Sequence, residues 1–424
     1  MLILFFSPFP PIMCGIASYT SYLVRGMPAD GWRGLSFDPH SYGSPVLKET
    51  PLQLEGKVSY SIPNPTCSPH TVYNRVAELA DGVECLVWVQ HAFGIWKDSS
   101  ALCRILRYLH SRGCHIVVTH HTIHFQSGET AYGMTAEEYD LLRHELPVVD
   151  AITVFSRHVK EAVAKAFPEH RDKVVVIRHG VPLHPNIPRE KAREELLNHL
   201  IHEAPLHERD RGGLRELRDT FLNPDTKVIG GIGFINPLKG HEAVYSTGDR
   251  LQKKMPDRSI LSLYMGQLRD PTNQTHLDCL RLMQGLHDGR RRLFINTYLP
   301  EEKLPAALKA LDVNLLWRED CTQSGILSHA QGAGATVAGR DLEVMGETLR
   351  MSGYPACKTY GEFVASVEDI LRDPKLEVSM AKTAGRYAEK FCWRNQAAKH
   401  LQLAESALEA PPNRHMFDEE KTLA

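Results

Sequence analysis

The chain has 424 residues, of which 49 are Lys or Arg and 51 are Asp or Glu, so its formal net charge is -2. This length exceeds one ordinary hydrophobic core and predicts two domains of similar size. The balanced charge excludes a strongly basic surface, so neither nucleic acid nor an anionic membrane is expected as a partner.

The first residues and the cysteines indicate where the protein works. Residues 1 to 6 are apolar, but no basic segment precedes them and Pro8, Pro10 and Pro11 follow. They are therefore interpreted as a buried strand and not as a signal peptide. The 9 cysteines are scattered and form no Cys-x-x-Cys pair, which is typical of reduced thiols and predicts a cytoplasmic location. No apolar run is long enough to span a bilayer.

Short apolar runs alternate with helical patterns in the first half. The predicted strands are residues 2–6, 85–89, 115–119, 151–155 and 173–177, and the predicted helices are residues 14–27, 100–110 and 157–167. Runs that are apolar throughout are typical of parallel strands covered on both faces. Residues 1–185 are therefore predicted to form a doubly wound, Rossmann-like α/β domain.

The second half repeats this pattern after a charged segment. Residues 186–225 are rich in Glu, Arg and His and are predicted to form one or two helices between the domains. The predicted strands that follow are 227–230, 259–264, 292–295, 312–316 and 335–338, and the predicted helices are 301–311, 325–332, 360–371 and two between 376 and 408. A second Rossmann-like domain is expected over 226–389, a C-terminal helix over 390–412 with Trp393 as its anchor, and a disordered tail over 413–424.

One stretch in the second half combines several features of an anion site. A buried strand ends near Ile229, a Gly-rich turn follows, and Lys239 precedes the start of a helix at about Gly240. Free N–H groups and the helix dipole then point the same way. The stretch is not a P-loop, because the spacing differs and no Ser or Thr follows the lysine. The simpler alternative is an ordinary turn with a surface lysine.

Other polar residues also follow predicted strands. Gly15, His91 and His121 lie in such turns of the first half, and Ser324 with Gly325 lies in one of the second half. Two domains of this kind in tandem place a ligand in the cleft between the carboxyl ends of their strands. A metal site built from His115, His120, His121 and His124 is not expected, because no carboxylate or cysteine completes the set at ligand spacing.

Nine short motifs occur along the chain in a fixed order. They are residues 11–20, 90–94, 118–122, 150–156 and 176–181 in the first half, and 233–240, 324–325, 332–337 and 391–393 in the second. In this order the chain resembles the retaining family-four-type glycosyltransferases, which have the GT-B fold of two Rossmann-like domains facing a central cleft. The resemblance covers roughly residues 1–400.

The resemblance implies transfer of a sugar from a UDP- or GDP-sugar to a hydroxyl of a glycan or small-molecule acceptor, with retention and without a metal or other cofactor. It implies His121 and Lys239 as catalytic residues. The residues implied on the donor side are Gly15, Lys239, Tyr298, Leu299, Ser324, Gly325, Ile326 and His329. Those implied on the acceptor side are His91, Phe93 and His120.

The chain departs from the family at several positions. Cys321 and His329 stand where the family has two glutamates, and Ala92 stands where it has an acidic residue. The family arginine that partners the lysine falls at Phe234, so Arg269 or Arg318 would have to replace it. A non-catalytic binding or partner protein with the same fold therefore remains an alternative, and a phosphorylase or an epimerase of this fold is a third possibility. The sugar, the nucleotide base and the oligomeric state do not follow from the sequence.

Overall fold

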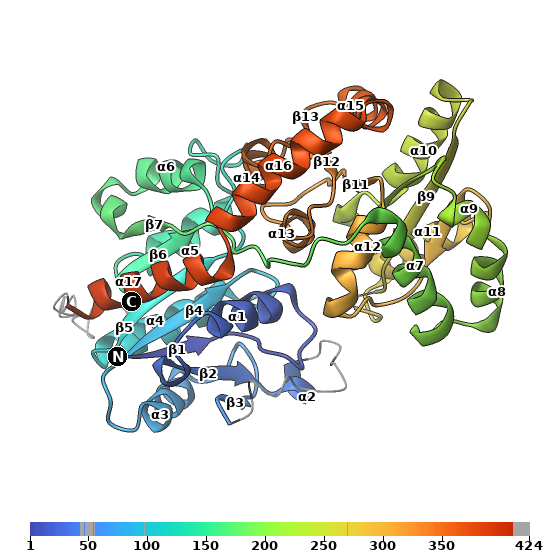
Figure 1. Ribbon diagram of the computed structural model, residues 1–424. Coiled ribbons are helices and arrows are strands. Elements are labelled where there is room, and N and C mark those ends of the chain that lie inside the picture. Colours follow the sequence, from blue (N-terminus) through green and yellow to red (C-terminus); the bar gives the residue numbers. More distant parts are fainter. Residues whose placement is uncertain (43–45, 47–53, 55, 97, 269, 410–424) are drawn as a thin grey trace. The chain divides into compact units, whose positions relative to one another are not determined.

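The structure is a computed structural model that describes residues 1–42, 46, 54, 56–96, 98–268 and 270–409. Two compact units divide the chain (Figure 1). Unit 1 is Met1–Gly180 with the C-terminal segment that begins at Trp393, and unit 2 is Val181–Cys392. Arg269 and the tail predicted to be disordered lie outside the described residues.

Unit 1 contains a parallel sheet of 7 strands in the order β3-β2-β1-β4-β5-β6-β7. The strands are β1 (Leu2–Phe6), β2 (Trp32–Phe37), β3 (Val58–Ile62), β4 (Cys85–His91), β5 (His115–His120), β6 (Ala151–Val154) and β7 (Val174–Val176). Every residue of β1 and β6 is buried, as expected for strands covered on both faces. The register aligns His91 with His120, so the carboxyl ends of β4 and β5 lie side by side.

Helices surround this sheet. They are α1 (Gly15–Arg25), α2 (Pro39–Tyr42), α3 (Pro69–Ala80), α4 (Ser99–Ser111), α5 (Ala136–Glu145), α6 (Arg157–Ala166) and α17 (Trp393–Glu409). The chain returns to unit 1 at α17, where the Trp393 ring stacks on Tyr22 of α1 with centroids 5.7 Å apart. Trp393 is thus the anchor of the last helix, as the sequence predicts.

Unit 2 contains a parallel sheet of 6 strands in the order β10-β9-β8-β11-β12-β13. The strands are β8 (Thr226–Ile232), β9 (Ser259–Met265), β10 (Arg292–Ile295), β11 (Val313–Leu316), β12 (Val337–Arg340) and β13 (Ala356–Cys357). Its helices are α7 (Arg189–Asn198), α8 (Glu208–Glu216), α9 (Arg218–Leu222), α10 (Glu242–Lys254), α11 (Gln274–Leu286), α12 (Leu304–Ala310), α13 (Gly325–Gly332), α14 (Glu343–Met351), α15 (Tyr360–Arg372) and α16 (Pro374–Lys390). The predicted α/β class with two parallel, Rossmann-like sheets is confirmed.

The charged segment 186–225 belongs to unit 2 and is not a separate piece of chain between domains. Its helix α7 carries Arg193, which is only 3% exposed. The Arg193 guanidinium forms an ion pair with Asp312 at 2.6 Å and donates to four backbone carbonyls. This buried network joins α7 to the sheet, which is why a segment rich in charge packs as part of the domain. No helix within the described ranges is long and apolar enough to cross a membrane.

Candidate functional site

The loop after β8 is built around two glycines. Gly233 has a φ of 139° and Gly240 a φ of 58°, both in the region that favours glycine. At Gly240 a Cβ would also lie 2.2 Å from the backbone oxygen of Trp317. Between them, the Asn236 side chain accepts a hydrogen bond from the Leu238 amide at 3.1 Å and starts a single 3-10 turn, Pro237–Lys239. The loop therefore fixes the backbone at Lys239.

The Lys239 ammonium lies beside the start of α13. The position that a Cβ at Gly233 would take is 3.9 Å from Lys239 Nζ and 3.9 Å from Ile326 Cγ1. Ser324 caps α13 by accepting from the Leu327 amide at 3.4 Å, and no heavy atom lies within 4 Å of a Cβ built on the exposed Gly325. The structure thus brings together Lys239 and the Ser324–Ile326 turn, which lie more than eighty residues apart in the sequence.

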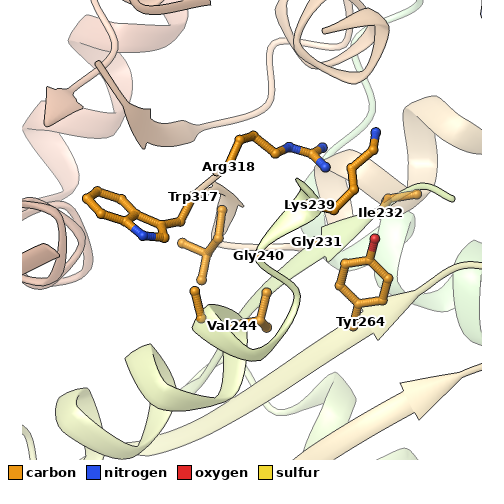
Figure 2. Close-up of a pocket in the computed structure, with 10 residues that line it drawn as sticks. Gly231, Ile232, Lys239, Gly240, Val244, Tyr264, Trp317 and Arg318 are labelled. Atoms are coloured by element: carbon orange, nitrogen blue, oxygen red, sulfur yellow. The ribbon is translucent and has the colours of Figure 1, made fainter. Parts of the chain in front are cut away.

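A small cavity lies behind this loop (Figure 2). Gly231, Lys239, Tyr264, Trp317 and Arg318 are among the residues that line it. Its volume of about 10 Å³ is the space that a single water molecule needs. A larger ligand would therefore bind over the cavity and not inside it.

The buried rings of His241 and Tyr264 support the loop through hydrogen bonds. His241 Nε2 accepts a hydrogen bond from the Asn236 amide at 3.1 Å, and its ring meets Tyr264 edge to face with centroids 4.5 Å apart. The Tyr264 hydroxyl in turn donates to the Gly233 carbonyl at 3.1 Å. Burial, and after it the charges of Arg318 and Lys239, lower the pKa of His241 to about 3. Burial also raises the pKa of Tyr264, so uncharged groups support the loop at neutral pH.

Two aromatic side chains flank the same loop. Phe234 and Tyr298, both half-buried, stack with ring centroids 6.3 Å apart and an angle of 28° between the ring planes. Leu299, the other residue implied in base packing, is only 5% exposed and belongs to the core of unit 2. Its side chain is thus part of the packing, and Tyr298 with Phe234 presents the accessible aromatic surface.

Cys321 and His329, which stand where the family has two glutamates, make other contacts in this chain. The Cys321 thiol donates to the Gln323 carbonyl at 3.1 Å, and burial raises its pKa although Arg318 and Lys239 act in the opposite direction. The His329 ring stacks on His184 with centroids 5.6 Å apart. Glu319, the nearest acidic alternative considered from the sequence, forms an ion pair with Arg340 at 3.0 Å.

His121 of unit 1 lies at the end of β5. Its Nε2 donates to Gln90 Oε1 at 2.7 Å, and its ring meets Tyr19 edge to face with centroids 4.7 Å apart. Burial, and then the neighbouring His179, hold the pKa of His121 well below its usual value. The imidazole is therefore uncharged at neutral pH. Gly15 is exposed at the first position of α1, and no heavy atom lies within 4 Å of its Cβ position.

The structure places His91 and His120, two of the predicted acceptor-side residues, in the interior of unit 1. The side chains of His120 and Glu145 are both 0% exposed and meet at 2.9 Å. His91 is also fully buried, and its ring lies 4.9 Å from the rings of Phe93 and His120. Both histidines are interior groups because β4 and β5 are central strands. Phe93 alone of the three is half-exposed.

Three of the histidines considered for a metal site each lie close to a different carboxylate. His115 lies 3.6 Å from Asp150, His124 lies 2.6 Å from Glu138, and His120 pairs with Glu145. Within the part of the chain that the structure describes, no group of three or more His, Cys, Asp or Glu side chains is arranged to hold a metal ion.

Comparison with known proteins agrees with this architecture. No family model matches the chain. The putative glycosyltransferase YtcC of Bacillus subtilis (strain 168) is 21% identical over 271 residues, which is 63% of this chain and 62% of that protein. The match thus spans less than two thirds of the relative.

Similar solved structures include trehalose-6-phosphate synthase OtsA, with a TM-score of 0.66 and 12% identity, and sucrose-phosphate synthase from Thermosynechococcus elongatus, with a TM-score of 0.66 and 15% identity. Each comparison covers 96% of this chain and 99% of the other. The chain has the GT-B fold. A UDP-forming α,α-trehalose-phosphate synthase from Burkholderia xenovorans superposes on this GT-B chain with a TM-score of 0.65, 11% identity and the same coverage.

Sequence reasoning missed part of the site in unit 2. It found Lys239 and Ser324 from their turns, but it assigned nothing to His241 or Tyr264. His241 follows directly after the Lys-Gly pair, so its place at the helix start was a usable signal. Tyr264 reads only as one more apolar residue of a strand.

Proposed function

We propose that this GT-B protein is a glycosyltransferase that moves a sugar from a UDP- or GDP-sugar to the hydroxyl of a glycan or small-molecule acceptor, with retention at the anomeric carbon. The observation that carries the proposal is the place of Lys239 Nζ beside Gly233 and the first turn of α13. A cation beside the start of a helix, where the helix dipole is positive, forms a site for phosphate. The putative glycosyltransferase YtcC and the UDP-forming synthase lend support.

The chemistry follows from the charge that such a reaction creates. When the bond between the sugar and the diphosphate breaks, negative charge grows on the leaving diphosphate. A fixed ammonium and fixed N–H dipoles stabilise this charge without having to reorganise. We propose that Lys239 and the amides at the start of α13 supply this stabilisation, so that the reaction needs no metal ion. Turnover that persists in EDTA would support this part of the proposal.

Replacement of Lys239 tests the donor site directly. We expect Lys239→Ala to weaken the binding of the nucleotide-sugar by about 1–3 kcal/mol, because one charge-assisted hydrogen bond to phosphate is lost. Calorimetric titration with UDP, GDP and their glucose and mannose conjugates gives the affinities of both proteins.

Lys253→Ala is the matched control, because Lys253 is an exposed lysine in the last turn of α10. It should bind as the wild type does. Equal affinities of wild type and Lys239→Ala would remove Lys239 from the site. If the wild-type protein binds none of these nucleotides while it melts cooperatively, the non-catalytic alternative gains instead.

A further inference from the structure

Arg318 is a buried cation that the fold does not neutralise. It follows β11 after one residue, lines the cavity behind the Lys239 loop and is only 4% exposed. Its Nε is buried without a hydrogen-bond partner, and no ion pair or hydrogen bond joins its guanidinium to any residue that the structure describes. Figure 2 shows this guanidinium directed toward the side chain of Lys239.

Arg193 of the same unit shows what a structural arginine looks like in this chain. At 3% exposure it is buried to the same degree, yet it meets Asp312 at 2.6 Å and four carbonyl oxygens. Removing a charge from water is costly unless counter-charges and hydrogen bonds replace the water. Arg193 has such partners and the Arg318 guanidinium does not, so no anionic group of the described residues balances the charge of Arg318.

The neighbouring acidic groups do not supply this anion. Glu319 is engaged with Arg340 at 3.0 Å. Asp320 is exposed, and no ion pair connects it to Arg318 within the described ranges. The Cys321 thiol, on which both cations act electrostatically, adds no negative charge, because burial raises its pKa. The surroundings thus leave Arg318 open to an anion from outside the chain.

We infer that Arg318 is the second cation of the anion site and that it binds the diphosphate of the donor together with Lys239. This inference rests on the proposed function. The second charge comes from the end of β11 and not from the loop that carries Lys239. Two cations side by side match a diphosphate better than a monophosphate, because the diphosphate spreads more negative charge over two groups.

The test uses the full-length protein, the variant Arg318→Gln and calorimetric titration with UDP, GDP, UMP and GMP. We expect Arg318→Gln to bind the preferred nucleoside diphosphate about 10- to 100-fold more weakly, with a smaller loss for the monophosphate. We also expect the melting temperature of the ligand-free variant to equal or exceed that of the wild type, because an unpaired buried charge has been removed.

Arg193→Gln is the matched control for a structural arginine, and it should lower the melting temperature sharply. Arg318→Lys keeps the charge and should recover part of the diphosphate affinity. If wild type and Arg318→Gln bind the diphosphate equally, the role of Arg318 is refuted while the proposed function stands. A marked loss of melting temperature in Arg318→Gln also refutes it, since Arg318 would then be structural. If the wild type binds no nucleotide at all, the proposed function fails and this inference fails with it.

Discussion

Gly325 is a position where a substitution is expected to change ligand affinity without lowering the stability of the fold. Its φ does not require glycine, it is exposed at the first position of α13, and a Cβ there would meet nothing within 4 Å. We therefore expect Gly325→Ala to fold with unchanged or slightly higher stability, since glycine loses more chain entropy on folding. If a phosphate approaches this helix start, the added methyl group should weaken donor binding by about 1 kcal/mol or more.

Calorimetry and thermal melting of the same samples give both quantities. Gly332→Ala is the contrasting variant, because its Cβ would lie 1.7 Å from the backbone oxygen of Pro182 and should destabilise the protein. Full donor affinity in Gly325→Ala would mean that no ligand comes close to this turn.

His121 offers a test of a chemical role in unit 1. Its imidazole is uncharged at neutral pH and is oriented by Gln90 at 2.7 Å, as a group that acts beside a reacting centre would have to be. We expect His121→Ala to lower kcat about 100-fold while the donor affinity changes little. Steady-state kinetics with calorimetry separates the two effects, and the exposed His40→Ala serves as control. A parallel loss of kcat and melting temperature would assign His121 to packing.

For single residues, the sequence predicted which side chains lie at the strand ends better than it predicted how exposed each side chain is. Strand ends were enough to find His91, His120 and His121 together, because parallel strands bring their carboxyl ends to one edge. They did not reveal that His91 and His120 face the interior while His121 is partly exposed. The sequence also could not show that Arg318 lacks an ion pair, because this depends on other residues such as Arg340, which forms an ion pair with the nearby Glu319.

Among the elements, α17 carries a prediction about the stability of unit 1. Trp393 is 7% exposed, stacks on Tyr22 and fills the space over Gly180, where a Cβ would lie 2.3 Å from its ring. We expect Trp393→Ala to lower the free energy of unfolding by about 3–5 kcal/mol, because it leaves a large cavity. Urea unfolding followed by circular dichroism measures this loss. Val378→Ala on α16, at a side chain 69% exposed, should change nothing measurable.

Uniformly apolar runs gave the central strands, because those strands are covered on both faces. The same rule missed three strands. Arg33 and Gly34 interrupt the apolar pattern of β2, Ser59 and Ser61 interrupt that of β3, and β13 has only 2 residues. Composition gave the wrong place for the segment 186–225, since its charge suggested helices between the domains, whereas Arg193 is buried against Asp312, 119 residues away. The local sequence pattern therefore identified the central strands, and it missed the features that depend on contacts between residues far apart in the sequence.

For the whole molecule, buried histidines link stability to pH in both units. Burial lowers the pKa of His400 in unit 1 to about 4 and that of His241 in unit 2 to about 3. In the unfolded chain both groups have a pKa of about 6.5. Between these values the unfolded state binds more protons than the folded state. The stability from each group is therefore complete above about pH 6.5 and is lost as the pH falls toward the folded value.

Each of these histidines should contribute a slope of about 1.4 kcal/mol per pH unit within that window. We expect urea midpoints to stay level between about pH 8 and about pH 7 and then to fall steadily toward about pH 4.5. Because burial is the main cause, added salt should leave the slope largely intact, whereas it would screen a surface ion pair. The exposed His40→Gln should show the wild-type curve. A midpoint that does not change from about pH 7 to about pH 4.5 would mean that these imidazoles take up protons without unfolding, and hence that water reaches them in the folded protein.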